Sequence, residues 1–236
     1  MYSNFEIAGN APLNDFLVPD TAQQQVLGTI LSAVDPFWGM GEFIYLKSND
    51  AIVKGSVITW DQNSVATLVP NTANQGFPLA VAVPGAASAG TFFWAQIGGL
   101  AVYKTNATVA AGTAIGITAA GVLGTNAAGK QVLNCKNVIA ATGTATVTAN
   151  TTLGSGVLVT NGYDGFFVGM ALSGTGIPAS TVVSRLNSDG RTIQMGSAIG
   201  LFDRTATASG TITLTGTYTG YGAGQISRPF AQGAIT

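Results

Sequence analysis

Threonine occupies every second position from Thr211 to Thr219, in the sequence T-I-T-L-T-G-T-Y-T. Successive side chains of a β-strand point to opposite faces, so an extended conformation places the threonine hydroxyls on one face. The other face then carries Ile212, Leu214 and Tyr218. The pattern therefore predicts a strand with one polar and one buried face.

Shorter alternating or β-branched runs recur through the chain, with turn residues such as Asn-Gly and Asp-Gly between them. They are Gly55–Trp60, Leu79–Val83, Phe93–Ile97, Thr144–Thr148, Val157–Thr160 and Thr181–Ser184. Many short strands separated by turns are typical of an all-β sandwich or barrel. The best helical segment, Thr21–Ser32, is weakened by Gly28 and Thr29. We therefore predict an all-β fold with a β-barrel or β-sandwich base domain.

The character of the sequence changes along the chain and divides it into four parts. Residues 1–35 lack clean periodicity but contain scattered large apolar side chains, which predicts an extended N-terminal arm that docks on another surface. A disordered tail is the alternative, although such tails are usually poor in aromatic residues. Residues 36–137 hold all three tryptophans and form the base domain. Residues 138–215, rich in Thr, Gly and Ser, form a second, smaller β-unit, and 216–236 end in a strand-like segment.

The composition excludes several classes of function. Only 8% of the 236 residues are charged, against about 25% in an ordinary soluble domain. With no histidine and one cysteine, the chain has neither the residues of Ser-His-Asp or Cys-His catalysis nor those of a zinc site or internal disulfide. Nine basic and ten acidic residues provide no clustered positive field, so we expect no nucleic-acid partner.

The hydropathy pattern predicts no membrane segment and the absent histidines predict little pH dependence. No stretch approaches the roughly 20 apolar residues that a spanning helix needs. The first residues, MYSNFEIAGN, show no secretory signal. Because histidine is the side chain whose ordinary pKa lies near neutrality, we expect the stability of the fold to change little between about pH 5 and 9.

One stretch, Gly124–Lys130, fits the G-x-x-x-x-G-K pattern of a phosphate-binding loop. Such a loop needs a hydroxyl at the next position and a helix after it. Here Gln131 follows and the next residues are β-like, so we interpret the segment as two strands joined by a turn.

The remaining candidates for chemistry are isolated. No spacing selects a pair of carboxylates for acid–base catalysis. Asp164, Asp189 and Asp203 do not form the dense acidic loop that calcium prefers. Cys135 lies in an apolar run and is expected to be a small buried side chain. We therefore predict that the protein is not an enzyme and has no catalytic residue, metal or cofactor.

The tryptophans divide into two kinds of environment. Trp60 and Trp94 lie in strand-like runs and are expected in the core. Phe37 and Trp38 lie in a loop-like junction between a proline and a glycine, where exposed aromatic rings favour a protein contact.

Several runs resemble the small capsid decoration, or cement, proteins of tailed bacteriophages. The resemblance spans about 36–135 and the last dozen residues. The similar runs are LGTILSAVDPFWGMGEFIYLKSND (27–50), GSVITWD (55–61), PLAVAV (78–83), GTFFWAQIGG (90–99) and QISRPFAQ (225–232).

A second resemblance covers 165–215. The run GFFVGMALSGTGIPASTVV, followed by DGRTIQMGSAIG and ATASGTITLTG, is similar to a β-module of phage virion proteins. In that module G-M-x-V-x-G-x-G-I-P precedes a T-I-T-L strand, and Ala171 and Leu172 depart mildly from the pattern. Decoration proteins tend to pass directly from the barrel to the R-P-F tail. The resemblance thus implies that 138–215 is an inserted, projecting, β-sandwich-like module and that 216–236 returns to the base domain.

The resemblance implies a structural protein on the exterior of a phage capsid, made in the cytoplasm of the bacterial host. Its partners would be the major capsid protein and other copies of itself, with a homotrimer favoured over a dimer. Its contact residues would be Phe5, Leu13, Phe16, Leu17, Phe37, Trp38, Arg228 and Phe230. The alternative is a receptor- or glycan-binding module carried by 138–215, which predicts exposed aromatic rings beside Asp or Asn.

Overall fold

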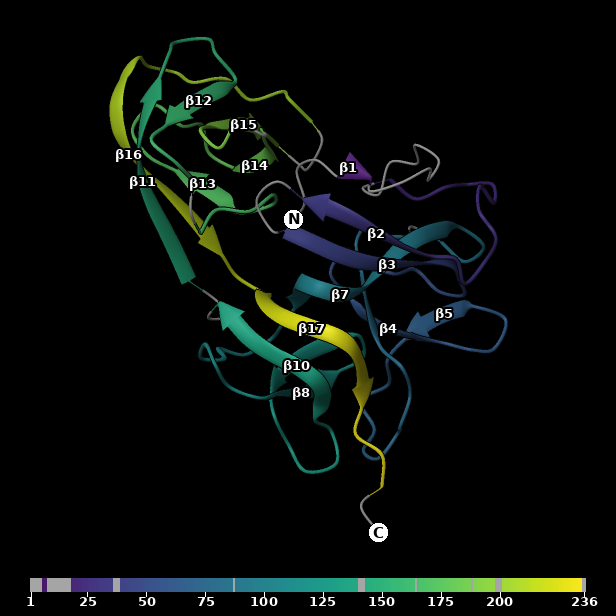
Figure 1. Ribbon diagram of the computed structural model, residues 1–236. Coiled ribbons are helices and arrows are strands. Elements are labelled where there is room, and N and C mark those ends of the chain that lie inside the picture. Colours follow the sequence, from purple (N-terminus) through teal and green to yellow (C-terminus); the bar gives the residue numbers. More distant parts are fainter. Residues whose placement is uncertain are drawn as a thin grey trace. The chain divides into compact units, whose positions relative to one another are not determined.

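The computed structural model describes residues 6–7, 18–35, 39–86, 88–139, 143–163, 165–187, 189–197 and 201–234 (Figure 1). These residues form strands, turns and bends but no helix, which confirms the predicted all-β fold class. The suggested helix at Thr21–Ser32 is wrong, because bends and turns lead there into a strand that begins at Ile30. Within the described ranges no helix has the length and apolarity to cross a membrane.

The chain divides into two compact units. The main part of one, the inserted unit, is Gly143–Thr219, and the other, the base unit, combines Glu6–Val34, Trp38–Thr142 and Gly220–Thr236. The inserted unit therefore interrupts the base unit in chain order. Its limits fall a few residues beyond the 138 and 215 expected from the sequence.

Most strands belong to the base unit. They are β1 (Glu6–Ile7), β2 (Ile30–Asp35), β3 (Gly39–Ser48), β4 (Val57–Trp60), β5 (Val65–Leu68), β6 (Ala80–Ala82), β7 (Phe92–Lys104), β8 (Ile115–Ala119), β9 (Val122–Thr125), β10 (Val132–Ile139) and β17 (Tyr221–Ala231). Strand β2 belongs to the main sheet, so the last part of the expected arm, 30–35, is a strand of the base unit.

Five strands of the base unit close into a ring. The pairings run β3–β5–β4–β6–β7, and β7 pairs with β3 again. The interior is apolar, with Leu46, Ile58 and Phe93 at 0% exposure. Alanines at inward positions, such as Ala80 and Ala95, leave space for these larger side chains. Apolar burial of this kind is the main stabilising term of the fold.

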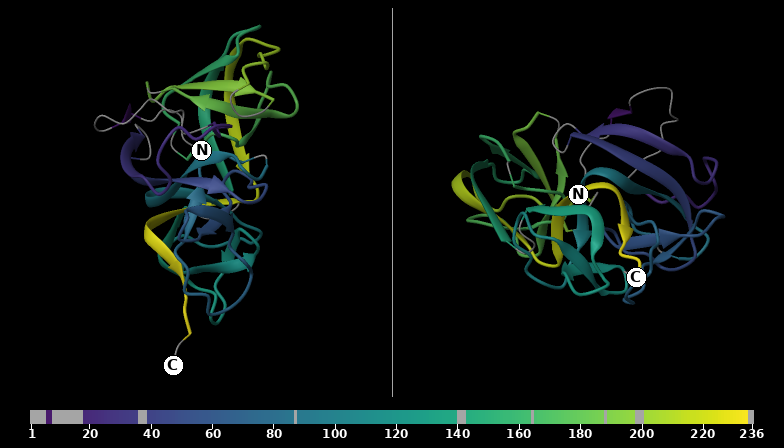
Figure 2. Two further views of the ribbon diagram at one scale, coloured as in Figure 1. Left: turned by 90° about the vertical axis from the view of Figure 1, so that its right-hand side faces the viewer. Right: turned by 60° about the horizontal axis from the view of Figure 1, so that its bottom comes forward.

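A second core forms where β7 continues beyond the ring. Its residues Gly98–Lys104 pair with Tyr221–Ser227 of β17, and β17 in turn pairs with β10 (Figure 2). The buried polar groups here are satisfied, because the Tyr103 hydroxyl donates to Asn137 Oδ1 at 2.6 Å and Asn137 Nδ2 donates to the Val109 carbonyl at 2.9 Å. The G-x-x-x-x-G-K stretch comprises the end of β9 and the turn that leads to β10, so two strands joined by a turn are present as predicted, without the helix of a phosphate-binding loop.

The inserted unit is a closed barrel in the order β11-β12-β15-β14-β13-β16. Its strands are β11 (Gly143–Thr151), β12 (Val157–Thr160), β13 (Ala171–Ser173), β14 (Thr181–Leu186), β15 (Thr192–Gly196) and β16 (Gly210–Tyr218).

Strand β16 has the two faces that its alternation predicts. Ile212, Leu214 and Tyr218 are buried, whereas Thr211 and Thr213 are exposed. Position 216 also faces inward, and a Cβ there would lie 2.6 Å from the Phe166 ring. The glycine that interrupts the apolar series therefore makes room for a buried aromatic side chain.

Candidate functional site

An apolar groove lies beside the C-terminal half of β17. It has a volume of about 400 Å³, which falls in the range of sites that bind ligands or side chains. Buried residues of the base unit, Ile44, Leu79 and Ile97, form part of its lining. The β17 groove is lined by Ile30, Ile44, Trp60, Gly76, Pro78, Leu79, Ile97, Arg228, Pro229 and Phe230.

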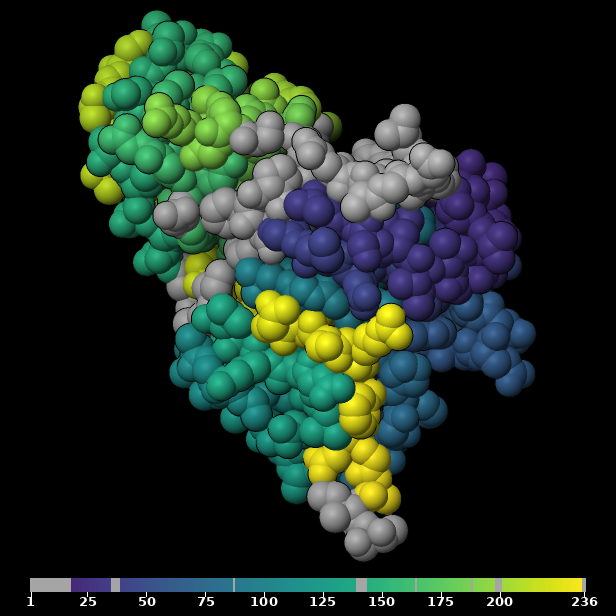
Figure 3. Space-filling model, in the orientation of Figure 1, coloured from purple at the N-terminus to yellow at the C-terminus, as the bar shows by residue number. Residues whose placement is uncertain are grey.

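The groove exists because β17 changes partners. It pairs with β7 as far as Ser227. Beyond that point the Leu79 amide donates to the Pro229 carbonyl at 2.8 Å, and the Ala231 amide donates to the Phe77 carbonyl at 2.9 Å. The space-filling view shows β17 crossing the surface of the base unit between β10 and the strands β2 and β3 (Figure 3).

The change of direction occurs at a strained residue. Arg228 has φ = 46°, in the left-handed region that favours glycine. Opposite it, β10 has a register shift between Leu133 and Cys135, and Asn134 has φ = 54°. A left-handed non-glycine residue costs on the order of 1 kcal/mol or more and persists only where the surrounding structure fixes it. Such strain is concentrated at functional sites, which makes Arg228 a candidate.

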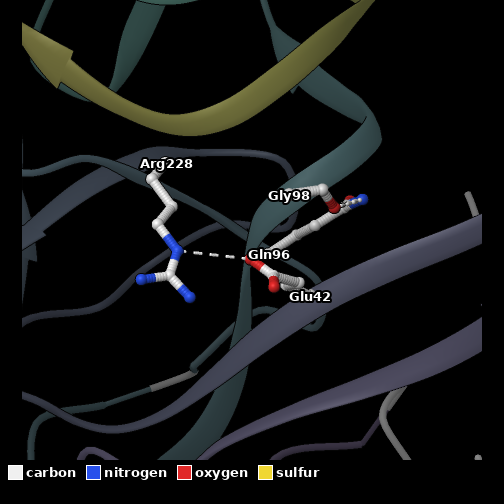
Figure 4. A network of polar contacts seen from close by, with 4 residues as sticks. All are labelled: Glu42, Gln96, Gly98 and Arg228. Carbon is white, nitrogen blue, oxygen red and sulfur yellow. Dashed lines mark hydrogen bonds and ion pairs between the residues drawn. The ribbon is translucent and has the colours of Figure 1, made fainter.

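Arg228, which lines the groove, is part of a network of polar contacts (Figure 4). Arg228 Nε donates to Glu42 Oε2 at 3.4 Å, with side chains 67% and 39% exposed, so the pair adds little stability. The buried Gln96 side chain donates to the Gly98 carbonyl at 2.8 Å. A Cβ at Gly98 would lie 3.2 Å from Glu42, so the absence of a side chain there lets Glu42 lie against β7.

Large apolar side chains of the groove reach solvent. Phe230 is 38% exposed and Ile30 is 47% exposed. Trp94 is buried as predicted, but Trp60 is only half-buried, because it packs against the ring core and also lines the groove. An apolar patch with a polar rim is typical of a protein contact surface.

The structure brings two of the sequence-derived contact residues together, since Arg228 and Phe230 both line the β17 groove. The other six, Phe5, Leu13, Phe16, Leu17, Phe37 and Trp38, lie outside the residues whose side chains the structure describes. The sequence reasoning missed Ile30, Trp60 and Pro78. The sequence holds one signal for a role of Trp60 in the groove. This residue lies at the end of a four-residue strand, directly before the Asp61 turn.

The other candidates for chemistry have structural roles. Burial raises the pKa of the Cys135 thiol to about 12, so this side chain stays protonated at neutral pH. The side-chain hydrogen bond from Thr192 lowers the pKa of Asp189, and that from Ser197 lowers the pKa of Asp203. Each carboxylate thus stabilises its own loop. Among the described residues, no three His, Cys, Asp or Glu side chains lie close enough together to hold a metal ion.

The inserted unit exposes one of its described aromatic rings. Phe202 is 55% exposed and precedes Asp203, which is the arrangement that the glycan-binding alternative predicts. The other aromatic residues of this unit are buried: Tyr163, Phe166, Phe167 and Tyr218.

Comparisons with family models, curated proteins and solved structures find no match for this chain.

Proposed function

We propose that this protein is a structural virion protein that binds the outer surface of a phage capsid as an oligomer and cements neighbouring capsid subunits. The observation that carries the proposal is the β17 groove. It exposes Phe230 and Ile30 beside the strained Arg228, within the Arg-Pro-Phe run that resembles the tail of decoration proteins.

The groove favours an apolar side chain from the capsid subunit as its occupant. Full burial of a large apolar side chain contributes about 1.5–3 kcal/mol, so covering the exposed part of Phe230 contributes about 1 kcal/mol. The exposed guanidinium of Arg228 then offers a hydrogen-bond donor at the rim. Few ions have to be desolvated on docking, because only 8% of the residues are charged.

Weak contacts of this kind suit a repeated surface. A capsid presents many equivalent sites, and an oligomer that engages several of them gains affinity through effective concentration. The N-terminal residues supply the second attachment in this proposal, for example by adding a strand to a sheet edge of a capsid subunit. A homotrimer fits three-fold positions on a shell, and a dimer fits two-fold positions.

The test is co-sedimentation of the purified protein with undecorated capsids of the phage that encodes it. We expect Phe230→Asp to reduce binding at least tenfold, because a carboxylate in the apolar groove is not solvated. Phe202→Asp is the matched control, since it changes an exposed ring of the inserted unit, 55% exposed against 38% for Phe230. Equal binding by both variants would overturn the groove as the contact surface.

A deletion separates the two attachments. Removing residues 1–17 deletes the two-residue edge strand β1 but leaves β2 and the other strands of the base sheet, and the proposal expects loss of capsid binding with little change in thermal unfolding. If this truncated protein decorates capsids as well as the full chain does, the N-terminal residues are not an attachment.

A further inference from the structure

The last part of β17 and the residues after it lie in a slot of the base unit. We call this segment, residues 229–234, the β17 tail. Phe230 lies opposite Pro78 on one edge of the slot and opposite Leu133 of β10 on the other edge. The β17 tail is therefore paired on both edges, as an inner strand of a sheet is.

The β17 tail completes the second core of the base unit. Ala231 is 1% exposed and belongs to that core, and Pro229 is also buried. The Gln232 amide donates to the Gln131 carbonyl at 2.9 Å. Without the tail, the core would be uncovered and these backbone groups would lose their partners. A tail of this sequence must therefore occupy the slot, whichever copy of the chain provides it.

Arg228 is the pivot that turns the β17 tail into its slot. Its φ of 46° lies in the left-handed region, which is uncommon for a residue other than glycine. The next residue is Pro229, whose ring crowds the residue before it and favours an extended backbone there, with φ of about −120°. Two local preferences therefore oppose the backbone conformation that holds each tail in the slot of its own chain.

An extended backbone at Arg228 directs the tail away from this slot and leaves the rest of β17 in place. The strand is paired with β7 as far as Ser227, and it curves before it reaches the slot (Figure 1). A strained hinge that relaxes when the chain extends favours the exchange of a segment between identical chains. A second copy is the fitting partner, because it carries the same slot and the same tail and so restores every contact.

We propose that the β17 tail exchanges between copies of this chain, so that the tail of one copy fills the slot of the next. Dilute protein keeps the closed form that the structure shows, and exchange increases with protein concentration because it joins separate molecules. Each β17 groove then takes its Pro229 and Phe230 from a neighbouring copy. The exchange goes beyond the proposed function, because it names how copies join and does not require capsid binding.

The first test places single cysteines on separate full-length chains, with Cys135→Ala in both to remove the native thiol. One chain carries Pro78→Cys and the other, labelled with ¹⁵N, carries Phe230→Cys, because these two positions lie directly opposite each other across the slot. The chains are mixed at high concentration, incubated and oxidised. We expect a disulfide-linked dimer of one labelled and one unlabelled chain, identified by mass spectrometry.

Two further samples make the cross-linking decisive. Thr213→Cys, at an exposed threonine of the inserted unit, replaces Pro78→Cys in the matched control mixture, which should give no such dimer. A single chain that carries both Pro78→Cys and Phe230→Cys then compares the two forms directly. If its disulfide is intrachain at every protein concentration, each tail stays in its own slot and the exchange is overturned.

The second test changes the pivot and measures association by light scattering. Arg228→Gly makes the left-handed backbone easy, so it should raise the concentration needed for association about fivefold. Arg228→Val should lower that concentration, because a β-branched residue disfavours the left-handed region further. Both variants lose the ion pair with Glu42, so the comparison between them isolates the backbone.

Ser64→Gly is the matched control for this series. Ser64 has φ = 59° in the turn between β4 and β5, so the substitution relieves the same kind of strain away from the pivot and should leave association unchanged. Equal association by Arg228→Gly and Arg228→Val would overturn the exchange. No capsid enters either experiment, so such a failure would leave the capsid-binding proposal to be decided by co-sedimentation.

Discussion

The two units of the chain are both built on closed rings of strands, yet they treat their apolar residues differently. In the inserted unit the barrel closes on itself, and Phe166 and Leu214 are fully buried inside it. In the base unit β7 continues beyond the ring and pairs there with β17, and two apolar residues that line the β17 groove, Phe230 and Ile30, are exposed. Closure removes sheet edges and hides apolar surface. The comparison teaches that exposed apolar surface arises where a strand leaves the closed ring.

The largest expected effect comes from adding a side chain to a glycine in each unit. Gly99 has φ = 92°, and a Cβ there would collide with the Met40 carbonyl, which is backbone and does not yield. Gly99→Ala should destabilise the base unit by about 4 kcal/mol. Gly216→Ala should cost the inserted unit about 2 kcal/mol, because it meets the Phe166 side chain, which has some freedom to shift.

Urea unfolding separates these two results. The two tryptophans that the structure describes, Trp60 and Trp94, belong to the base unit, so tryptophan fluorescence follows that unit. Far-ultraviolet circular dichroism follows the strands of both units, and its difference from the fluorescence transition reports the inserted unit. A shift of the tryptophan transition by Gly216→Ala as large as that by Gly99→Ala would show that the units do not unfold independently.

Two buried threonines sharpen the comparison. The Thr160 hydroxyl of the inserted unit donates to the Arg191 carbonyl at 2.8 Å and accepts from the Gly162 amide at 3.3 Å, so Thr160→Val should cost about 1–2 kcal/mol by removing both hydrogen bonds. Thr59 of the base unit has no such partner, and Thr59→Val should leave stability unchanged or raise it by about 0.5 kcal/mol. Thermal denaturation of both variants measures the difference. Equal destabilisation by the two substitutions would contradict the assignment of Thr59 as unsatisfied.

The strain at Arg228 is tested by comparing two replacements at one position. Both Arg228→Ala and Arg228→Gly remove the ion pair with Glu42, but only glycine relieves the left-handed backbone. The glycine variant should be more stable than the alanine variant by about 1 kcal/mol. Equal urea midpoints for the two variants would mean that the backbone at 228 is not strained.

The smallest effect concerns pH. Asp61 in the base unit and Asp189 and Asp203 in the inserted unit have lowered pKa values, so their stabilisation is present above their unfolded pKa of about 4 and is lost as the pH falls through the folded pKa. Cys135 has a raised pKa of about 12, so its contribution is full below its ordinary value and is lost as the pH rises toward 12. Urea midpoints should therefore stay constant from pH 5 to 9. Cys135→Ala should reduce the alkaline loss in the tryptophan signal alone.

Sequence patterns predicted the regular parts of this molecule well. The threonine alternation identified β16 and its faces, and the turn residues identified β9 and β10. Local patterns carry this information because side-chain direction in a strand depends only on neighbouring residues.

The β17 groove was predictable only in part. Arg228 and Phe230 were recognised from the Arg-Pro-Phe run, but Ile30 and Trp60 are about 200 and 170 positions away in the sequence, and only the closure of the strand ring brings them near. The left-handed backbone at Arg228 could not be predicted from the sequence either, because it accompanies a register shift in β10, the strand that lies opposite. Long-range pairing and its irregularities are set by tertiary packing rather than by local sequence.

The route of the chain between the units has a mechanical consequence. The chain leaves the base unit at the end of β10 and returns at the start of β17, and these ends are neighbours, since Ile139 pairs with Ala223. A pull on the inserted unit along these strands loads β17 in shear against β7. The seven residue pairs from Tyr221–Lys104 to Ser227–Gly98 then resist together instead of opening one after another. The base unit is therefore arranged to resist tension along β17.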